Sequence, residues 1–471
     1  MKSQNFFRRK SISDLIAHSE KPGSSLKKSL SAFDLTMLGV GAVVGAGIFV
    51  LPGKVASEIT GPSIIISFII AGIACALAAL CYSEFASSVP VAGSAYTYSY
   101  AVFGELIAWI LGWALLLEYG LAAASVASGW SSYLQGLLAG FNIHLPHAIS
   151  GAFNPAQGTY FDLPAVLIVL IIAFLLTWGI NESAKVNAVM VLIKVAVVVL
   201  FIVVGIWYVK PTNWTPFAPF GFHGIVTGAA TVFFAYIGFD AVSTAAEEVK
   251  NPQRNMPIGI IASLLICTLL YIILSSVLTG IVPYTQLVGV GNPVAFGLQF
   301  IHQDWVAGFL SLGAIVGMTT VILVMTYGGT RLVYAMSRDG LLPKGLSKVN
   351  KKTKTPVVNT WVFCLIIAFF AGFISLDKLA EMVNIGTLFA FTMVSLGIFF
   401  LRKMKNKPNS VFKVPFFPVL PAVSFVLCLY LIFNLKWITW LSFGIWLVIG
   451  LIIYGLYGSR KSTLRNERDE S

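Results

Sequence analysis

Two short glycine-containing segments interrupt apolar stretches of this chain, and their backbone groups are its best candidates for binding chemistry. The first runs from Gly39 to Phe49 and the second from Phe234 to Asp240. A helix that breaks inside a membrane frees N–H and C=O groups, which persist only where they line a cavity or meet a ligand. Two breaks at matching places in two halves of a chain are typical of the central binding site of a transporter.

In the first segment, Gly45, Ala46 and Gly47 are small residues in immediate succession. Close helix packing is the alternative interpretation, because small residues such as Gly41 and Gly45 can form a helix face on which a neighbouring helix approaches closely. Their density, with Pro52 shortly afterwards, favours an unwound helix. The amides that begin the second half-helix would then bind a carboxylate.

In the second segment, the stretch Phe234-Ala235-Tyr236-Ile237-Gly238 would offer carbonyl groups to an ammonium group if the helix stops there. The neighbouring aromatic rings could close the pocket. Ordinary aromatic packing is the alternative interpretation. The matching position of the two breaks favours the binding site.

Ionisable side chains within apolar stretches cost at least ~2.5 kcal/mol on insertion scales, so they are candidates for function. Lys194 lies in the middle of such a stretch, too far from either end to reach water easily, and Glu118 lies in another. A buried ion pair between Lys194 and Glu118 is one interpretation. The favoured one is a proton-carrying cation beside the first break. Asp240, Glu247 and Glu248 are further acids in or near the second broken stretch.

The composition predicts that these residues are positioned by membrane helices. The chain is 57% hydrophobic and 11% charged, with a mean hydropathy of +0.86, whereas soluble domains contain about 25% charged residues. One span needs about 20 mostly apolar residues. Twelve stretches qualify, so the chain is expected to be an all-α polytopic membrane protein with spans near 32–57, 61–84, 104–136, 162–180, 186–208, 223–246, 258–282, 304–336, 357–374, 378–401, 416–434 and 437–458.

The net charge of +12 is spread in a way that indicates membrane topology and not nucleic-acid binding. Lysine and arginine gather in alternate connections and in both tails. The connections between them hold only Lys54, Lys210, Lys378 and Lys436. This pattern predicts that both termini are cytoplasmic. The polar, basic first residues do not resemble a cleavable signal, so the first span is expected to be retained.

Twelve spans divide naturally into five, five and two. We expect a cytoplasmic tail at 1–30, a first repeat at 31–210, a second at 211–403, two further spans at 404–458 and a cytoplasmic tail at 459–471. An odd number of spans per repeat inserts the two halves with opposite orientation. The result is a 5+5 inverted repeat with helices 1 and 6 unwound at the midplane.

Several other functions find no support in the residue pattern. The five cysteines form no CxxC pair and the five histidines no metal-like cluster, so we expect no metal site. A nucleotide-binding glycine loop of the Walker type is missing, so no nucleotide-driven step is expected. The spans lack clustered catalytic side chains. We therefore expect no enzyme activity, no catalytic residues and no cofactor.

Five segments together carry a resemblance to a known family. With them, the chain resembles the amino acid–polyamine–organocation superfamily over about residues 28–458, and more closely the bacterial members of the cationic amino acid transporter group. This resemblance implies a LeuT-like five-plus-five inverted-repeat fold and uptake of amino acids. The segments are Gly41-Ala-Val-Val-Gly-Ala-Gly-Ile-Phe49, Pro90-Val-Ala-Gly-Ser-Ala-Tyr96, the stretch from Phe233 to Glu248, Asn251-Pro252 and Ser337-Arg-Asp-Gly-Leu-Leu-Pro343.

The resemblance also implies roles for individual residues. The substrate carboxylate would meet the amides of Ala46 and Gly47, and the amine would meet the carbonyls of Val43, Phe234 and Ile237. Ala46 departs from the family pattern, since relatives often carry Ser or Thr there. Ala46 still offers its backbone amide to the substrate, but it has no hydroxyl group for a further contact.

For coupling, Lys194 matches the lysine that replaces a sodium ion in proton-coupled relatives, and Glu118 matches an acidic residue of this group. For selectivity, Val324, Met325 and Thr326 offer no carboxylate to a cationic side chain, and Met325 is expected to cap the side-chain pocket.

We therefore expect a secondary transporter that imports neutral L-amino acids, such as alanine, serine, threonine or branched-chain ones, with protons by alternating access. Its partners would be the amino acid, protons and membrane lipids, with no nucleic acid or nucleotide. It would lie in the cell membrane, as a multi-pass protein of a bacterial plasma membrane. The alternatives are a cationic amino acid carrier or exchanger and a non-transporting amino acid sensor.

Overall fold

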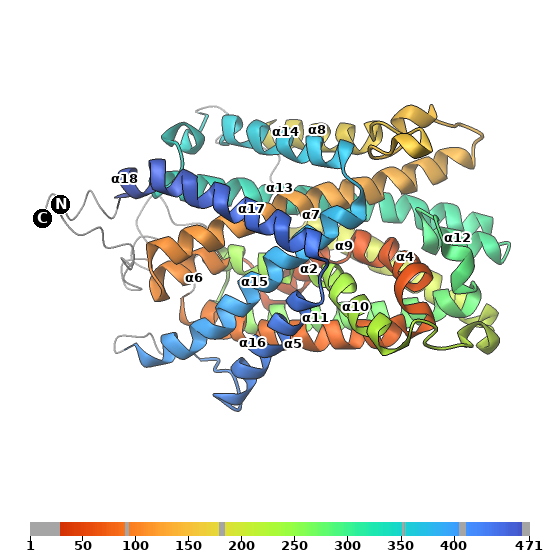
Figure 1. Ribbon diagram of the computed structural model, residues 1–471, viewed down its shortest axis with the longest axis horizontal. Helices are drawn as coiled ribbons and strands as arrows, with labels where there is room; N and C mark the ends of the chain where they lie inside the picture. The colour runs from red at the N-terminus through yellow and green to blue at the C-terminus, as the bar shows by residue number, and fades with distance from the viewer. Residues whose placement is uncertain are drawn as a thin grey trace, which may run out of the picture.

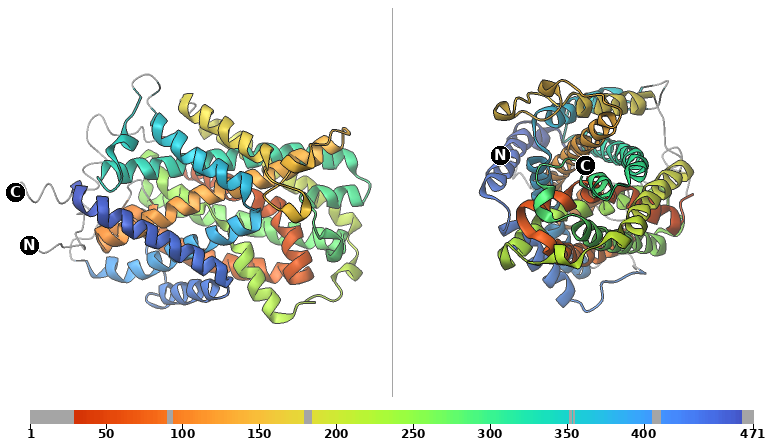
Figure 2. Two further views of the ribbon diagram at one scale, coloured as in Figure 1. Left: turned by 45° about the horizontal axis from the view of Figure 1, so that its top comes forward. Right: turned by 90° about the vertical axis from the view of Figure 1, so that its right-hand side faces the viewer.

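The computed structural model describes residues 29–89, 94–178, 184–350, 353, 355–404 and 411–463. Most of the two predicted tails and residues 90–93 of one family segment lie outside the described residues. The long helices run along the long axis of the molecule (Figure 1), and the end-on view shows them packed side by side (Figure 2). The prediction of an all-helical polytopic protein is confirmed for this part of the chain.

Within the described residues, seven helical stretches are long and apolar enough to cross a membrane, and five shorter apolar helices accompany them. Most of their bounds agree with the predicted stretches to within a few residues. The helix Ala32–Val43 ends well before residue 57, the helical stretch Gly221–Tyr236 ends before residue 246, and the stretch Leu51–Ser88 begins before residue 61. The twelve-span topology and the inverted repeat remain predictions. The long stretches contain α5 (Ile64–Ser88), α7 (Glu105–Ala139), α9 (Ala184–Gly205), α11 (Pro252–Ile281), α13 (Asp304–Arg338), α15 (Leu376–Lys403) and α17 (Trp437–Ile453), and the shorter ones are α2 (Ala32–Val43), α8 (Leu163–Trp178), α10 (Gly221–Val232), α14 (Val357–Phe373) and α16 (Val419–Phe433).

The first predicted span is interrupted at the glycine-rich segment. Its first half, α2, begins with a capping box. The Ser31 hydroxyl accepts a hydrogen bond from the Asp34 amide, and the Asp34 carboxylate accepts one from the Ser31 amide. The helix ends at Val43. After two intervening residues, α3 (Ala46–Phe49) begins and leads into α4 (Leu51–Val55). Gly45 bridges the gap with a φ of −144° and a ψ of −139°.

The span expected at 223–246 is interrupted as well. Helix α10 passes into a 3₁₀ turn, η7 (Phe233–Tyr236), and after Gly238 into a long 3₁₀ segment, η8 (Phe239–Glu248). Gly238 has a φ of +117°, which side-chain-bearing residues rarely adopt. Its lack of a side chain therefore permits the change of direction between the two halves.

Helix α6 (Ser94–Val102) was not predicted, because its polar sequence resembles a connection between two spans. Every one of its residues is nevertheless buried. A short helix, α12 (Pro293–Phe300), lies in the connection between α11 and α13. In Figure 1, α6 and α18 (Ser459–Lys461) lie at one end of the bundle, and α4 and α12 lie at the other.

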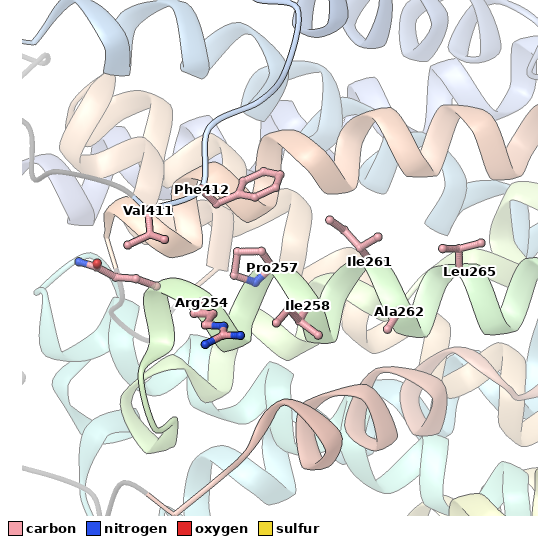
Figure 3. A pocket seen from close by; sticks show the side chains of 9 residues that line it. Arg254, Pro257, Ile258, Ile261, Ala262, Leu265, Val411 and Phe412 are labelled. Atoms are coloured by element: carbon pink, nitrogen blue, oxygen red, sulfur yellow. The ribbon is translucent and has the colours of Figure 1, made fainter.

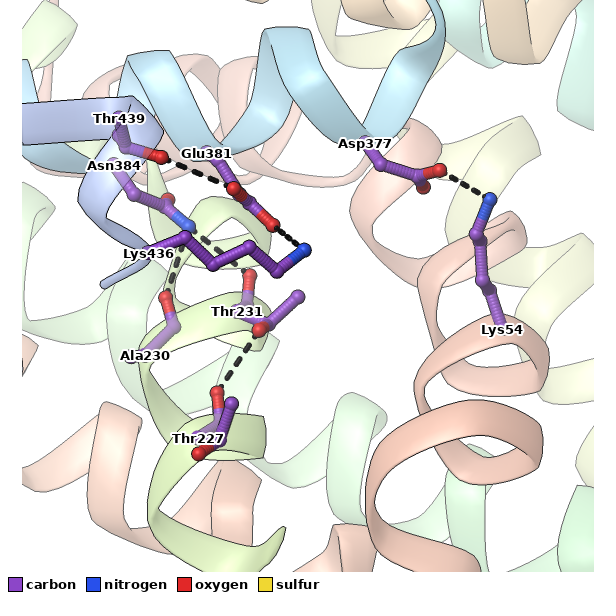
Figure 4. Close-up of polar contacts among 9 residues, drawn as sticks. All are labelled: Lys54, Thr227, Ala230, Thr231, Asp377, Glu381, Asn384, Lys436 and Thr439. Atoms are coloured by element: carbon purple, nitrogen blue, oxygen red, sulfur yellow. Dashed lines mark hydrogen bonds and ion pairs between the residues drawn. The ribbon is translucent and has the colours of Figure 1, made fainter. Parts of the chain in front are cut away.

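Helix α15 makes polar contacts to other helices along its length, as Figure 4 shows for one part. Asp377 forms an ion pair with Lys54 of α4, and Glu381 pairs with Lys436, which precedes α17. Near its other end, Arg402 makes hydrogen bonds of 2.8 and 2.7 Å to Glu84 of α5. These contacts connect α15 to both the first broken span and its neighbours.

Candidate functional site

A small buried pocket lies where the two helix breaks face α7 and α13. Its free volume is only ≈ 10 Å³, which is close to the minimum that holds one water molecule. The structure is therefore nearly closed around this site. The lining residues are Ala42, Val43, Gly45, Ala46, Gly47, Ala122, Val126, Phe234, Ile237, Val321 and Met325, which include all the predicted binding residues except Ala235 and Gly238.

Ala235 and Gly238 lie at contacts between the two breaks. A Cβ atom added to Gly47 would lie 2.5 Å from Ala235 Cα, so the two backbones touch without a side chain between them. A Cβ on Gly238 would lie 2.8 Å from the terminal methyl of Met325 and 3.0 Å from the carbonyl of Ala42. These residues set the distance between the breaks and do not line the pocket.

The start of α3 presents backbone donors at the pocket. Among the described residues, the amides of Ala46 and Gly47 donate no backbone hydrogen bond. The Gly45 carbonyl, by contrast, already accepts from Ile48 and Phe49 over 3.1 and 3.3 Å. Amides at the first positions of a helix attract a negative group. This end of the pocket is therefore suited to an anion such as a carboxylate.

Tyr271 of α11 connects the carbonyl groups of the two breaks, and sequence reasoning missed it. Its hydroxyl lies 3.0 Å from the Val43 carbonyl oxygen and 2.6 Å from that of Ala235. The Phe234 carbonyl accepts from the Ile237 amide over 3.2 Å. Because each carbonyl oxygen has two lone pairs, these groups retain capacity for an ammonium donor.

Lys194 of α9 lies beside the first break and is 0% exposed. Its ammonium donates to the carbonyls of Gly41 and Val44 over 2.6 and 3.2 Å. On α13 it reaches the Gly317 carbonyl over 3.4 Å and the Thr320 hydroxyl over 3.0 Å. A cation at the last carbonyls of α2 also complements the helix dipole.

Glu118 of α7 is not the partner of Lys194 in this structure. Neither of its carboxylate oxygens has a hydrogen-bond partner among the described residues, although the side chain is buried. It interacts instead with Asp240 of η8 and faces Thr387 of α15. The hydrogen bonds of Lys194 described above go to backbone carbonyls and to the Thr320 hydroxyl, and none of them goes to Glu118.

The remaining wall of the pocket is apolar. Ala122 and Val126 of α7 and Val321 of α13 join Met325 there. Sequence reasoning missed the first three, because small aliphatic residues in apolar helices give no signal of their own. The pocket lining includes no carboxylate, so this wall is suited to an uncharged side chain.

A larger cavity of ≈ 440 Å³ lies on α11, away from the breaks (Figure 3). Its lining is mostly aliphatic, with Arg254 at one end. Ile258 and Leu265 are 44% and 58% exposed, so this is an outward-facing groove of the helix. It contains none of the predicted binding residues.

Paired helix breaks around a closed pocket, in a bundle of apolar helices, are the features of a membrane transporter. Comparison with known protein families also indicates a transporter, because the family described as "Amino acid permease" matches residues 30–459. The chain belongs to the amino acid permease family. It is a multi-pass membrane transporter and not an enzyme.

Three relatives show the range within this family. A methylthioribose transporter of Bacillus subtilis (strain 168) is 54% identical over 98% of this chain and its own full length. The branched-chain amino acid permease BcaP of the same organism is 53% identical over 97% of this chain and 98% of its own. The vacuolar cationic amino acid transporter 4 of Arabidopsis thaliana is 41% identical over 84% of this chain and 66% of its own.

Proposed function

We propose that this protein imports neutral L-amino acids with side chains up to branched-chain size, together with protons, by alternating access. The observation that carries this proposal is the pocket itself. The amides of Ala46 and Gly47, which donate no backbone hydrogen bond, line one part of the pocket. Residues of the second break line another part. A zwitterion carries the two charges that such backbone groups bind.

In the proposed complex, the carboxylate accepts from the amides of Ala46 and Gly47, and the ammonium donates to the carbonyls of Val43, Phe234 and Ile237. The side chain then meets the aliphatic wall. The pocket must widen on binding, because its present free space of ≈ 10 Å³ holds no amino acid. The flexible thioether of Met325 is the part of the wall best able to move.

Coupling is assigned to Lys194, with Glu118 as a second titratable group. Protonated Lys194 holds the end of α2 against α9 and α13 through the bonds described above. Loss of its proton would remove the positive charge and one of the three N–H donors, which would weaken those bonds and let the first break move. A fixed cation at this place repels Na⁺, which favours protons as the driving ion.

The relatives support a neutral substrate without selecting one. The name of the branched-chain permease agrees with an aliphatic pocket wall. Methylthioribose is a second candidate, favoured by the 54% identity over the full length of that relative. A cationic amino acid is less suited, because the pocket lining has no carboxylate.

The proposal includes the topology expected from the sequence. Twelve spans form two inverted repeats of five, with the repeat bounds given above, and both termini are cytoplasmic in a bacterial plasma membrane. A reporter enzyme that is active only outside the cytoplasm, fused to the C-terminus, should remain inactive. Activity of that fusion would contradict the orientation.

Counterflow in proteoliposomes tests the function directly. The purified protein is tested with labelled leucine, valine, isoleucine, alanine, serine, threonine, lysine, arginine and methylthioribose. We expect exchange of the neutral amino acids, and concentrative uptake when an inward proton gradient is applied. Exchange of only lysine and arginine, or only methylthioribose, would contradict the substrate class. Binding without flux would identify a sensor, and a Na⁺ requirement would contradict proton coupling.

A further inference from the structure

We propose that the groove on α11 binds an anionic phospholipid, with one acyl chain in the groove and the phosphate at the Arg254 guanidinium. The groove is the ≈ 440 Å³ cavity between α11 and the segment that contains Val411 and Phe412. It lies outside the substrate pocket, so the inference goes beyond the proposed transport and is independent of the substrate. The proposed orientation of the chain serves only to name the leaflet, which is the cytoplasmic one.

One wall of the groove is a row of side chains on the first half of α11. Figure 3 shows this row running along the helix from Arg254 to Leu265. Its members recur at intervals of three and four positions, so they share one helix face. Ile258 and Leu265 are 44% and 58% exposed, so the rest of the described chain leaves this face open. The row consists of Arg254, Pro257, Ile258, Ile261, Ala262 and Leu265.

The second wall precedes α16 and is held in place by α5. The Ser87 hydroxyl of α5 accepts a hydrogen bond of 3.3 Å from the Phe412 amide and donates one of 3.1 Å to the Gln253 carbonyl. This carbonyl has no helical donor, because Pro257 lies four positions later and lacks an amide hydrogen. One hydroxyl therefore connects both walls at the polar end of the groove, and tertiary contacts define its width.

The length of the row matches one leaflet of a bilayer. Leu265 follows Arg254 by 11 positions, which is about 16 Å at about 1.5 Å per residue. Half of the hydrocarbon thickness of a membrane is about 15 Å. A lipid with its phosphate at Arg254 would therefore lay its acyl chain along the row and reach the midplane near Leu265.

The charges at the Arg254 end favour a negatively charged group. The Arg254 side chain is exposed, and none of the ion pairs between described residues includes it. Lys250 and Lys413 lie close in sequence to the two walls and are exposed as well. Neither 249–281 nor 402–433 contains an aspartate or a glutamate. With the positive end of the α11 dipole, these cations suit the phosphate of an anionic lipid.

Two other occupants fit the groove less well. In a twofold dimer the same patch meets itself, so the cations around Arg254 would face those of a second copy. An amino acid is too short to fill a row of about 16 Å, and it would place its ammonium group in the same field of positive charge. An acyl chain with an anionic headgroup matches both the apolar row and its charged end.

A lipid in this groove should stabilise the helix that connects the two breaks. The same α11 carries Tyr271, whose hydroxyl contacts the carbonyls of Val43 and Ala235. A ligand that binds only the folded protein raises its stability in proportion to occupancy. The lipid should therefore raise the temperature of unfolding.

The first test is titration of the delipidated full-length protein in detergent with phosphatidylglycerol or with phosphatidylcholine of the same acyl chains. Native mass spectrometry gives the apparent Kd, and thermal unfolding gives the stabilisation. The wild type should prefer phosphatidylglycerol. Arg254→Gln should reduce this preference about fivefold, the change that corresponds to about 1 kcal/mol for one basic residue near a lipid surface. Arg338→Gln, at an exposed arginine of α13, should leave it unchanged.

A second variant tests the acyl-chain groove separately from the charge. Ala262→Phe places a ring in the row and should weaken binding of both lipids, whereas Ala422→Phe, at an exposed alanine of α16, should not. A phosphatidylglycerol with a photoreactive acyl chain should label 258–265 of the wild type in proteoliposomes, and Ala262→Phe should remove that label.

Three results would overturn the proposal. Equal binding of the two lipids by the wild type, or an unchanged preference in Arg254→Gln, would exclude recognition of the phosphate. Labelling that stays the same in Ala262→Phe would place the acyl chain elsewhere. A disulfide between two copies of Leu265→Cys in membranes would identify a dimer interface in place of a lipid site. None of these results depends on whether the protein transports an amino acid.

Discussion

Lys194 donates a hydrogen bond of 2.6 Å to the carbonyl oxygen of Gly41, although the two residues are 153 positions apart. This carbonyl belongs to the last turn of α2, where the break removes the amides that would otherwise donate hydrogen bonds to it. The lysine thus stabilises the unwound region directly. Any change in its protonation alters the hydrogen bonding of the first break.

Lys194→Ala should abolish proton-driven accumulation while leaving some binding or exchange. The substitution removes the ammonium group but not the pocket amides and carbonyls. It also leaves buried carbonyls without donors, at a cost of about 1–3 kcal/mol each in stability. Substrate-induced alkalinisation outside proteoliposomes and uptake under a pH gradient are the measurements. Lys210→Ala, at an exposed lysine, is the control, and concentrative proton-driven uptake by Lys194→Ala would refute this role.

Gly47→Ala should weaken substrate binding strongly. Its new Cβ would lie 2.5 Å from Ala235 Cα, a contact that only a backbone shift can relieve. The two breaks would move apart, and the amide of residue 47 would leave its place. Binding is measured by ligand-induced thermal shift in detergent. Gly308→Ala, where the added methyl meets nothing within 4 Å, should bind normally. Unchanged affinity in Gly47→Ala would exclude this contact as part of the site.

Met325→Ser should extend the substrate range toward larger or cationic side chains. The Met325 side chain lines the pocket and contacts the region of Gly238, so its removal enlarges a nearly closed cavity. A counterflow panel before and after the substitution gives the answer. Met382→Ser, on α15 and outside the pocket lining, is the control. An unchanged panel would mean that Met325 does not limit side-chain size.

Most of the helical architecture could be predicted from apolar run length, because a membrane helix must satisfy its own backbone. The break at Gly45 was predictable for the same reason, since the small residues leave a visible gap in the pattern. Helix α6 was not, because its serines and tyrosines are buried by neighbouring helices and not by lipid. Burial of this kind depends on tertiary contacts that a local pattern does not contain.

The site was predictable where backbone chemistry defines it and unpredictable where packing does. Gly47 and Ile237 were expected at the pocket because they belong to the breaks. Ala122 and Val126 were not, because α7 presents many similar aliphatic residues. Tyr271 belongs to α11, far from either break in sequence, and only its hydroxyl position shows that it connects them.

The ion pair between Lys54 and Asp377 should hold the far end of the first broken span closed. It joins α4 to α15 (Figure 4), at the end that the sequence assigns to the outside. Because the side chains are 33% and 36% exposed, the pair should contribute only about 0.2–1 kcal/mol. Lys54→Gln should therefore raise the accessibility of the pocket from outside by a modest factor, measured by labelling of an Ala122→Cys variant.

A charge swap supplies the control for this pair. Lys54→Asp combined with Asp377→Lys should restore wild-type labelling, while each single change should not. Lys436→Gln breaks the pair between Glu381 and the residue preceding α17, which does not involve the broken span. It should leave labelling unchanged. Equal effects of Lys436→Gln and Lys54→Gln would show that the pair at α4 is not specific to opening.

Asp162, the residue just before α8, should make the stability of the protein depend on pH. Burial raises the pKa of its carboxyl group from 3.8 to about 6, and hydrogen bonds from the Ser131 hydroxyl (2.6 Å) and the Ala165 amide (3.1 Å) only partly offset this. The folded protein therefore binds this proton more tightly than the unfolded chain does. Its stability should fall as pH rises from about 4 to about 6, by up to about 3 kcal/mol, and then level off.

Asp162→Asn keeps an oxygen acceptor for Ser131 and Ala165 but carries no charge at any pH. It should remove the fall between pH 4 and 6 and should be more stable than the wild type above pH 6. The measurement is the midpoint of thermal unfolding against pH, with Asp304→Asn, an exposed acid at the start of α13, as the control. If Asp162→Asn keeps the wild-type slope, or is less stable above pH 6, then burial does not destabilise the ionised carboxylate and the prediction is contradicted.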